Sequence, residues 1–339
     1  MLTSLFILIG IPVVASEIKL EISSECKQRG KFCDSSDGKI SASSVQIETS
    51  AITNQFTGDQ KTLSFMSFQF NFFSNESKTE RNKKEEATEM KISCEEWKVP
   101  ENFVFKEFES EPVEGFPELL KRKYSNILSE LKGKELAEIT ESSDVIPSKY
   151  EGGLKTWECS IDLLSFLKEE ENIKFDVSNV LEVGCGSGLP GIFCHKIALN
   201  PKLFVFQDFN QNVLESVTLP NLLLNSAKEE TLNLENFKFF FGDWESFPQN
   251  LPEKTFDLIL TSETIYRSES YQILLEIFSH SLSLKAGARV LLAAKDYYFG
   301  LGGSIQQFSK YAASNGWNVQ ILRQFSEGVP RSILELTRK

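Results

Sequence analysis

A dense run of glycines at 184–191, directly after an apolar segment at 179–183, constrains this chain more than any other feature. The apolar segment (NVLEV) predicts a short buried strand. Glycines that follow a strand permit a tight turn and let a ligand lie against the backbone. The amides at the start of the next helix then face that ligand. The segment therefore predicts a strand–loop–helix unit that binds a small molecule.

Two ligands compete for this glycine loop. Read from Gly186, the segment has the GxGxxG spacing of dinucleotide-binding proteins, but that fingerprint should begin where the strand ends, at Gly184. Read from Gly184, it is GxGxG with an acid two residues earlier, which is an arrangement that holds the methionine part of S-adenosylmethionine. This second interpretation favours S-adenosylmethionine over NAD. Its candidate cofactor residues are Glu182, Gly184, Gly186 and Gly188.

Strands and helices alternate from about residue 150 onward. Such alternation predicts a parallel sheet with helices on both faces. The last two strands are separated only by 324–331, which leaves no room for a helix, so they must form a hairpin. We therefore expect an α/β fold: a Rossmann-like, seven-strand class I methyltransferase sheet with a C-terminal antiparallel hairpin strand. The predicted strands are 179–183, 203–207, 237–241, 256–261, 288–294, 318–323 and 332–337. Helices are predicted at 157–167, 213–225, 271–284 and 304–315.

Polar residues follow several of these strands at the edge where ligands bind in open α/β sheets. Asp208 ends the second strand, where its carboxylate can accept both ribose hydroxyls; it can also cap the helix near Gln211. Asp243 and Trp244 follow the third strand and could hold the adenine amino group and ring, although a loop Trp is often ordinary core. Glu263 ends the fourth strand, with a plain surface acid as the alternative.

The net charge of −12 argues against a nucleic-acid-binding enzyme with a broad basic face, because phosphate neutralisation dominates such binding. An acidic enzyme suits a basic protein target. Six cysteines without paired spacing and two histidines disfavour a zinc site and a disulfide framework, so we expect no metal and an intracellular catalytic part. Cys185, His195 and His280 are interpreted as structural residues.

The N-terminal part differs in texture. Residues 5–15 form an apolar run of signal-peptide length that is too short to span a bilayer and has no Lys or Arg before it. Secretion is therefore the minor interpretation. We expect an atypical extension with this leader at 1–65, a low-complexity, disordered region at 66–110, a helical lead-in at 111–149 and the S-adenosylmethionine-dependent methyltransferase domain at 150–339.

Several segments together resemble methyltransferase family 16. They are 182–188 (EVGCGSG), 207–210 (QDFN), 218–221 (TLPN), 242–244 (GDW) and 261–266 (TSETIY), and the E-x-x-Y type signature of that family is matched by Glu263 and Tyr266. Two more segments, 152–159 (GGLKTWEC) and 297–303 (YYFGLGG), resemble the protein-histidine N-methyltransferases typified by methyltransferase-like protein 18. The resemblance covers about residues 145–339.

This resemblance implies methylation of the tele nitrogen of a histidine in large-subunit ribosomal protein three. Glu263 is then the first candidate to accept the other ring N–H, with Tyr266 and Tyr298 shaping the pocket. We expect a monomer in the cytoplasm and nucleus, including the nucleolus, without membrane or direct nucleic-acid binding. The implied cofactor contacts are Thr156, Trp157, Glu158, Cys159, Ser160, Gly184, Gln207, Asp208, Phe209, Gly242, Asp243, Trp244 and Ser262.

Three other functions stay open at this point. A lysine methyltransferase of the same family would share the cofactor site, although the 298–303 segment argues against it. An NAD-dependent oxidoreductase would need a hydride-handling residue, and none is evident. A non-catalytic scaffold in ribosome assembly would bind the cofactor without methyl transfer. Finally, 66–73 (MSFQFNFF) resembles the usual start of these enzymes, so we hypothesise that Met66 is the authentic N-terminus.

Overall fold

The computed structural model describes residues 93–100, 108–131, 144–146, 149–170, 177–226 and 234–339, all of which lie within one compact unit, Ala87–Lys339. The predictions about residues 1–65, the apolar leader, Met66 and most of the low-complexity region fall outside these residues. Among the described helices, none is both long and apolar enough to cross a membrane.

One mixed sheet forms the centre of the unit, in the order β1-β6-β5-β4-β7-β8-β10-β9, in which β1 is Glu95–Trp97. Strands β6, β5, β4, β7 and β8 run parallel, whereas β10 is antiparallel to both β8 and β9. The predicted seven-strand sheet and its closing hairpin are thereby confirmed. The strand bounds are β4 Asn179–Val183, β5 Leu203–Asp208, β6 Phe237–Phe241, β7 Leu258–Ser262, β8 Arg289–Lys295, β9 Trp317–Phe325 and β10 Arg331–Arg338.

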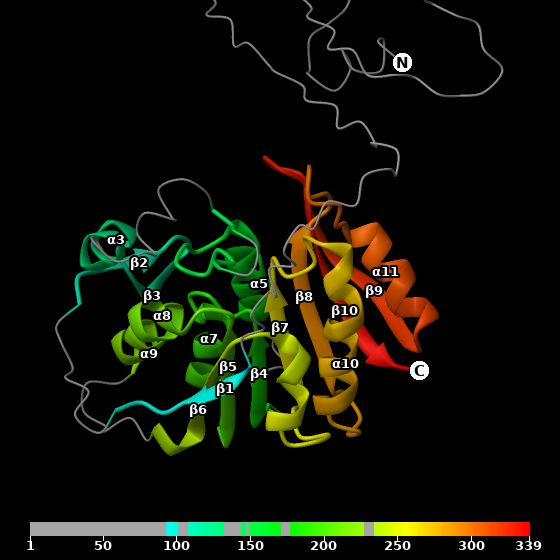
Figure 1. Ribbon diagram of the computed structural model, residues 1–339, viewed down its shortest axis with the longest axis horizontal. Helices are drawn as coiled ribbons and strands as arrows, with labels where there is room; N and C mark the ends of the chain where they lie inside the picture. The colour runs from blue at the N-terminus through cyan, green and yellow to red at the C-terminus, as the bar shows by residue number, and fades with distance from the viewer. Residues whose placement is uncertain (1–92, 101–107, 132–143, 147–148, 171–176, 227–233) are drawn as a thin grey trace, which may run out of the picture. The chain divides into compact units, whose positions relative to one another are not determined.

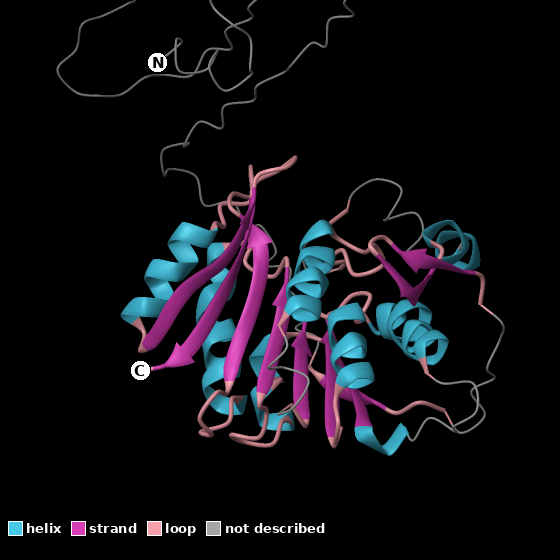
Figure 2. Cartoon of the chain, turned by 180° about the vertical axis from the view of Figure 1, so that it is seen from behind, coloured by secondary structure: helices cyan, strands magenta, loops and turns pink. Residues whose placement is uncertain are grey.

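Apolar residues on both sides of these strands create two cores, one on each face of the sheet. Val180 points into the core under α5 and α7, while its neighbour Leu181 points into the core under α10 and α11. This alternation follows from the two-residue period of a strand. Figure 1 and Figure 2 show the two faces with their helices. The helices are α5 Glu158–Glu169, α7 Leu189–Ile197, α8 Gln211–Val213, α9 Leu219–Asn225, α10 Tyr271–Ser281 and α11 Ile305–Ser314.

The helix predicted at 213–225 contains a π-helical turn, Leu214–Thr218, between α8 and α9. Such turns are often found at functional sites. Here it brings the hydroxyl of Thr218 within 2.7 Å of the carbonyl oxygen of Gly186, in the glycine loop. The irregular turn therefore anchors that loop from outside.

Two predictions upstream of the sheet are wrong in part. Glu95–Trp97 forms an eighth strand, β1, antiparallel to β6, within a region predicted to be disordered. Trp97 packs edge-on against Phe239 with ring centroids 5.7 Å apart, so one aromatic side chain supplies the burial that the local composition lacks.

The second correction concerns the segment 111–149, where the sequence predicted a helical lead-in. The structure has a separate hairpin, β2 Ser110–Val113 and β3 Phe116–Arg122, followed by a shorter helix, α3 Tyr124–Leu131. Amide side chains of α9 determine this outcome. Asn225 accepts from the amide of Leu120 and donates to its carbonyl, which satisfies the free edge of β3 as a neighbouring strand would.

Candidate active site

A cavity of about 930 Å³ lies at the carboxyl edge of the parallel strands, within the range of small-molecule sites, roughly 300–1,000 Å³. The glycine loop after β4, the ends of β5, β6, β7 and β8, and the segment before α5 all contribute to it. This is the edge at which open α/β sheets bind ligands. We describe it as a cofactor end, around the glycine loop with Gln207, Asp208 and Trp244, and an acceptor end, around Glu263, Tyr266, Lys295 and Tyr298.

The glycine loop is shaped by its neighbours. Gly184 and Gly186 have φ values of 61° and 50°, which only glycine adopts without strain. The Gly186 N–H donates to Oδ2 of Asp208 over 3.0 Å, and the Gly184 N–H donates to Oε1 of Gln207 over 3.1 Å. The last two residues of β5 therefore hold both turns of the loop.

Gln207 is fully buried and joins three segments of the cofactor end. Besides accepting from Gly184, its Oε1 accepts from the indole N–H of Trp244 at 2.7 Å. Its amide nitrogen donates to the carbonyl of Gly242 at 3.0 Å. The side chain thus fixes the indole that the sequence assigned to the adenine ring, and it does so from beneath the cavity.

Asp208 lines the cavity but is almost completely buried. Burial raises the pKa of its carboxyl to about 6, although backbone N–H groups of Asn210 and Gly186 oppose this rise. Its Oδ1 accepts from the Asn210 N–H, and Asn210 itself, not Asp208, precedes the helix as its cap residue. A side chain at Gly153 would collide with this carboxylate, so the backbone at 152–153 packs directly on it.

A second layer supports the loop from α9. Asn221 donates to the carbonyl of Ser187 at 2.9 Å and accepts from the backbone N–H of Arg122 at 2.8 Å. Together with Thr218, it links the glycine loop to the β2–β3 hairpin. These two residues explain why the segment TLPN at 218–221 accompanies the glycine motif.

Some residues predicted to contact the cofactor do not line the cavity. Glu182 differs most: it points to the α7 face of the sheet, where its Oε2 accepts from the Gly191 N–H at 2.8 Å. Burial raises the pKa of this carboxyl to about 8. The strand period decides its side, because Glu182 shares a face with Val180. The predicted residues outside the lining are Thr156, Glu158, Cys159, Glu182, Gly188 and Gln207.

The structure brings the remaining predicted residues together. It collects them from six separate segments of the chain around one cavity. Those that line it are Trp157, Ser160, Gly184, Gly186, Asp208, Phe209, Gly242, Asp243, Trp244, Ser262, Glu263, Tyr266 and Tyr298.

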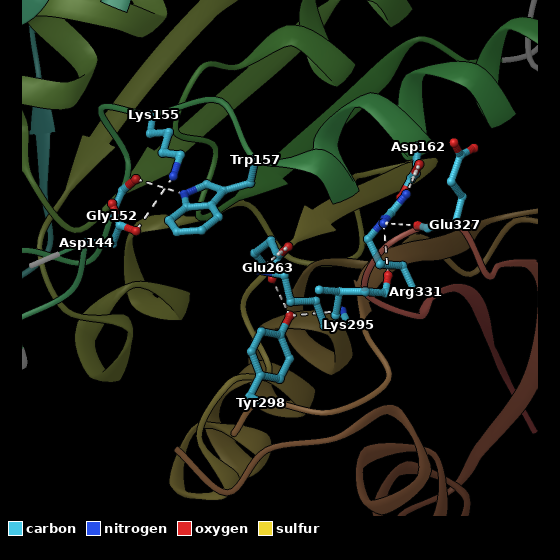
Figure 3. Close-up of polar contacts among 11 residues, drawn as sticks. Asp144, Gly152, Lys155, Trp157, Asp162, Glu263, Lys295, Tyr298, Glu327 and Arg331 are labelled. Carbon is cyan, nitrogen blue, oxygen red and sulfur yellow. Dashed lines mark hydrogen bonds and ion pairs between the residues drawn. The ribbon is translucent and has the colours of Figure 1, made fainter. Parts of the chain in front are cut away.

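At the acceptor end, Glu263 adopts a left-handed backbone conformation, φ 58°, immediately after β7. Such strain, about 1 kcal/mol for a residue with a side chain, often marks functional sites. Its Oε2 accepts from the hydroxyl of Tyr298 at 2.6 Å, and its Oε1 lies 3.6 Å from Nζ of Lys295 (Figure 3). Burial, followed by the nearby Glu263 charge, raises the pKa of the Tyr298 phenol well above its usual value.

Lys295 also lies 4.8 Å from the ring centroid of Trp157, within the range of a cation–π interaction. The indole N–H of Trp157 donates to the carbonyl of Gly152, so the ring is fixed in place (Figure 3). The ammonium of Lys155 lies 4.6 Å from the same ring. Trp157 therefore orders the two cationic side chains beside the cavity.

Tyr266 is held by a different acid. Its hydroxyl donates to Glu151, whose carboxylate also accepts from Arg267 at 2.8 Å. Burial and the Glu151 charge raise the pKa of the Tyr266 phenol. The rings of Tyr266 and Tyr298 meet edge to face with centroids 6.3 Å apart, so two aromatic walls close one side of the acceptor end.

Sequence reasoning missed Lys295, Glu151 and Arg267 as cavity residues. Lys295 directly follows the predicted fifth strand, so its place at the carboxyl edge was a usable signal. Glu151 and Arg267 each adjoin a quoted segment, but nothing local shows that residues 116 positions apart form an ion pair.

The cavity fits S-adenosylmethionine by its own chemistry. It offers a loop with no side chains at Gly184 and Gly186, a carboxylate at Asp208 and an indole at Trp244. Ser160 adds a buried hydroxyl oxygen that finds no hydrogen-bond partner among the described residues. An unsatisfied buried polar atom in a cavity wall is stabilised by a ligand that bonds to it. Among these residues there is also no group of three or more His, Cys, Asp or Glu that could hold a metal ion.

The strand order and this site define the class. The chain has the Rossmann-like sheet of S-adenosylmethionine-dependent methyltransferases, with its cofactor end at the glycine loop. Residues 147–298 match the model of methyltransferase family 16, which is described as lysine methyltransferase. These residues are therefore similar to that family.

The chain is also similar to three proteins named as histidine protein methyltransferase 1 or its homologue. The protein from Dictyostelium discoideum is 38% identical over 61% of this chain and 64% of its own length. The protein from Mus musculus is 40% identical over 58% of this chain and 59% of its own, and that from Schizosaccharomyces pombe 37% over 57% and 66%. The chain thus spans about 60% of the length of these curated relatives.

Among solved structures, a SAM dependent methyltransferase from Aquifex aeolicus has a TM-score of 0.40. It is 17% identical over 52% of this chain and 88% of that chain.

Proposed function

We propose that this protein is an S-adenosylmethionine-dependent protein-histidine N-methyltransferase. Its proposed product is a histidine methylated on the tele nitrogen, and its proposed target is large-subunit ribosomal protein three. The observation that carries the reaction type is the similarity to relatives named for histidine methylation, which reach 40% identity. The tele position and the ribosomal target rest on the resemblance of the 152–159 and 297–303 segments to that group.

The cofactor, when bound, supplies an electrophilic methyl group for an in-line displacement, so positioning makes the largest contribution to the rate. The side chains of Gln207 and Asp208 hold the loop amides and Trp244 in place through hydrogen bonds. Their bonds to the backbone fix the shape of the cofactor end before any ligand enters. Preorganisation of this kind lowers the free-energy cost of binding.

The acceptor end needs no strong base. An unperturbed histidine has a pKa near 6.5, so its ring is mostly neutral at pH 7 and one nitrogen keeps its lone pair. The chain must orient the ring and accept the proton of the other nitrogen. Glu263 Oε1 takes no hydrogen bond from any described residue, and Nζ of Lys295 lies 3.6 Å from it. We propose that this oxygen accepts the ring N–H once the substrate displaces Lys295.

The test is to incubate the full chain with tritiated S-adenosylmethionine and ribosomal fractions from cells that lack the enzyme. The labelled protein and residue are then identified by mass spectrometry. Label on a histidine of ribosomal protein three, at the tele nitrogen, is the expected result. An exposed-residue variant, Glu253→Gln, provides the matched control for protein quality.

Other outcomes would replace the proposal. The description of the family model as lysine methyltransferase favours lysine as the second candidate, and label on lysine would establish it. Cofactor binding without any label would instead support a non-catalytic role in ribosome assembly. We further propose that the enzyme acts in the cytoplasm and nucleus as a monomer, which fractionation and sedimentation of the endogenous protein would test.

A further inference from the structure

An apolar tip stands at the rim of the cavity. It consists of Tyr297, Phe299 and Leu301, whose exposed fractions are 59%, 84% and 44%. Tyr298 lies between the first two and points inward to Glu263. Leu301 and Tyr298 line the cavity, so the tip continues directly from the acceptor end. Large apolar side chains that gather in this way on a surface commonly mark a binding site.

The tip is presented by a rigid loop. Both of its arms are bound: the Tyr298 N–H donates to the Gly303 carbonyl at 3.1 Å, and the Gly303 N–H donates to the Tyr266 carbonyl at 3.0 Å. A side chain at Gly303 would collide with the carbonyl of Ile265, so glycine is required for this close approach. A loop fixed in this way loses little freedom when a partner binds.

An acidic edge lines the same cavity from another element. It consists of Glu269, Gln272 and Glu276, which are all exposed and lie three and four residues apart around the start of α10. That spacing places them on one side of the helix. Glu276 accepts from Gln272 at 2.8 Å, and neither glutamate forms an ion pair with a described cation.

The three basic residues of the cavity lining are already matched by acids of the lining. Lys155 pairs with Asp144, Arg267 with Glu151 and Lys295 with Glu263. This leaves a net negative rim that includes the acidic edge. Such a rim attracts a cationic partner and repels the phosphates of a nucleic acid.

We propose that the apolar tip and the acidic edge together dock a basic, extended segment of the protein substrate. An apolar side chain of that segment packs on Phe299, and its Lys or Arg side chains face Glu269 and Glu276. This inference rests on the proposed function, because it assigns the substrate class of the same site. It also separates recognition of the polypeptide from the chemistry at Glu263 and Tyr298.

The test uses the full chain and a fluorescent Lys/Arg-rich peptide that contains one histidine and one nearby phenylalanine. The double variant Tyr297→Ser/Phe299→Ser should raise the Kd of the peptide about tenfold or more, since aromatic anchors dominate such contacts. The matched control is Leu284→Ser, which removes an apolar side chain that is 72% exposed and lies outside the cavity lining. The control variant should bind the peptide with the Kd of the wild type. The Kd of S-adenosylmethionine should be unchanged in the double variant.

The charge contribution is measured separately. Glu269→Gln/Glu276→Gln should weaken peptide binding severalfold and flatten its dependence on salt concentration, because screening then has less attraction to remove. With the natural substrate, both double variants should raise KM and leave kcat intact.

Binding and methyl transfer are read independently. If the wild type binds the peptide without methylating any substrate, and the double variants lose this binding, the docking surface is supported and the proposed function is rejected. Methylation with an unchanged KM and Kd in both double variants would overturn the docking surface and leave the proposed function standing. Tighter binding of single-stranded RNA than of the peptide at this surface would also overturn it.

Discussion

The two ends of the cavity are built in different ways. At the cofactor end, Gln207 and Asp208 bond mainly to the backbone N–H and C=O groups of neighbouring loops. At the acceptor end, Glu263 bonds to the side chains of Tyr298 and Lys295. Backbone partners come with the topology of the fold, whereas side-chain partners depend on which residues occupy a few positions.

This difference separates stability from specificity. Changes at the cofactor end remove bonds that hold the fold and the cofactor loop together, so stability and cofactor affinity should change together. Changes at the acceptor end should alter the rate while the fold and cofactor affinity remain. Five variants test that division, in order of decreasing expected effect.

Glu182→Gln should have the largest effect, on stability alone. Burial raises the pKa of Glu182 to about 8, above its unfolded value near 4.5, so the protonated carboxyl favours the folded state. This contribution is fully present below pH 4.5 and is lost as the pH rises through 8. The free energy of unfolding of the neutral variant should therefore exceed that of the wild type by about 4 kcal/mol at pH 8, and the two should be equal at pH 4.

Urea unfolding of both proteins at several pH values measures this gain. An equal difference at every pH would show that Glu182 does not titrate as described. A changed cofactor Kd would return Glu182 to the cofactor contacts and so break the comparison.

Gln207→Ala should have the next largest effect. It removes three buried hydrogen bonds, to Gly184, Trp244 and Gly242, at about 1 kcal/mol each, for a loss near 3 kcal/mol. Calorimetry should show weaker cofactor binding in the same protein. Lowered stability with intact cofactor affinity would mean that the glycine loop does not depend on this side chain.

Glu263→Gln should lower kcat about 100-fold, the lower range for a group that handles a proton. Glutamine can still accept from Tyr298, but it cannot pair with Lys295. The cofactor Kd should stay within about threefold, since a factor of that size is under 1 kcal/mol. Single-turnover methyl transfer gives the measurement, and a full rate would remove Glu263 from the mechanism.

The smallest effects distinguish the two lysines beside Trp157. Lys155 and its partner Asp144 are both largely exposed, so Lys155→Met should change stability by less than about 0.5 kcal/mol. Lys295 is 21% exposed and pairs with Glu263, whose side chain is 10% exposed, so Lys295→Met should cost about 1 kcal/mol of stability and alter the rate of methyl transfer. If the two variants had the same stability and the same rate, Lys295 would contribute no more to the acceptor end than Lys155 does.

Most of the fold could be predicted because its signals are local. The strands β4 and β6 have the predicted bounds, and the closing hairpin followed from the short segment between two strands. The errors lie upstream, where β1 and β3 depend on distant partners. Phe239 supplies the packing for β1, and Asn225 satisfies the edge of β3 from 105 residues away.

The candidate site divides in the same way. Gly184, Gly186 and Asp208 follow strands directly, so their place at the carboxyl edge is a consequence of parallel topology. Glu182 was wrongly predicted to contact the cofactor, because a motif gives only the spacing along the chain. The face of the strand on which Glu182 lies directs its carboxyl to the α7 side of the sheet instead. Lys295, Glu151 and Arg267 became site residues only through contacts across the cavity.

The sequence by itself determined the order of strands and helices, the glycine loop and the class of cofactor, because each depends on residues within a few positions of one another. The tertiary structure alone decided the partners of Glu263 and Tyr266, the burial of Glu182 and the meeting of Leu301, Glu269 and Glu276 in the lining of one cavity. These features need chain segments that are far apart in sequence to meet. The free energy of that meeting comes from the two cores on either side of the sheet.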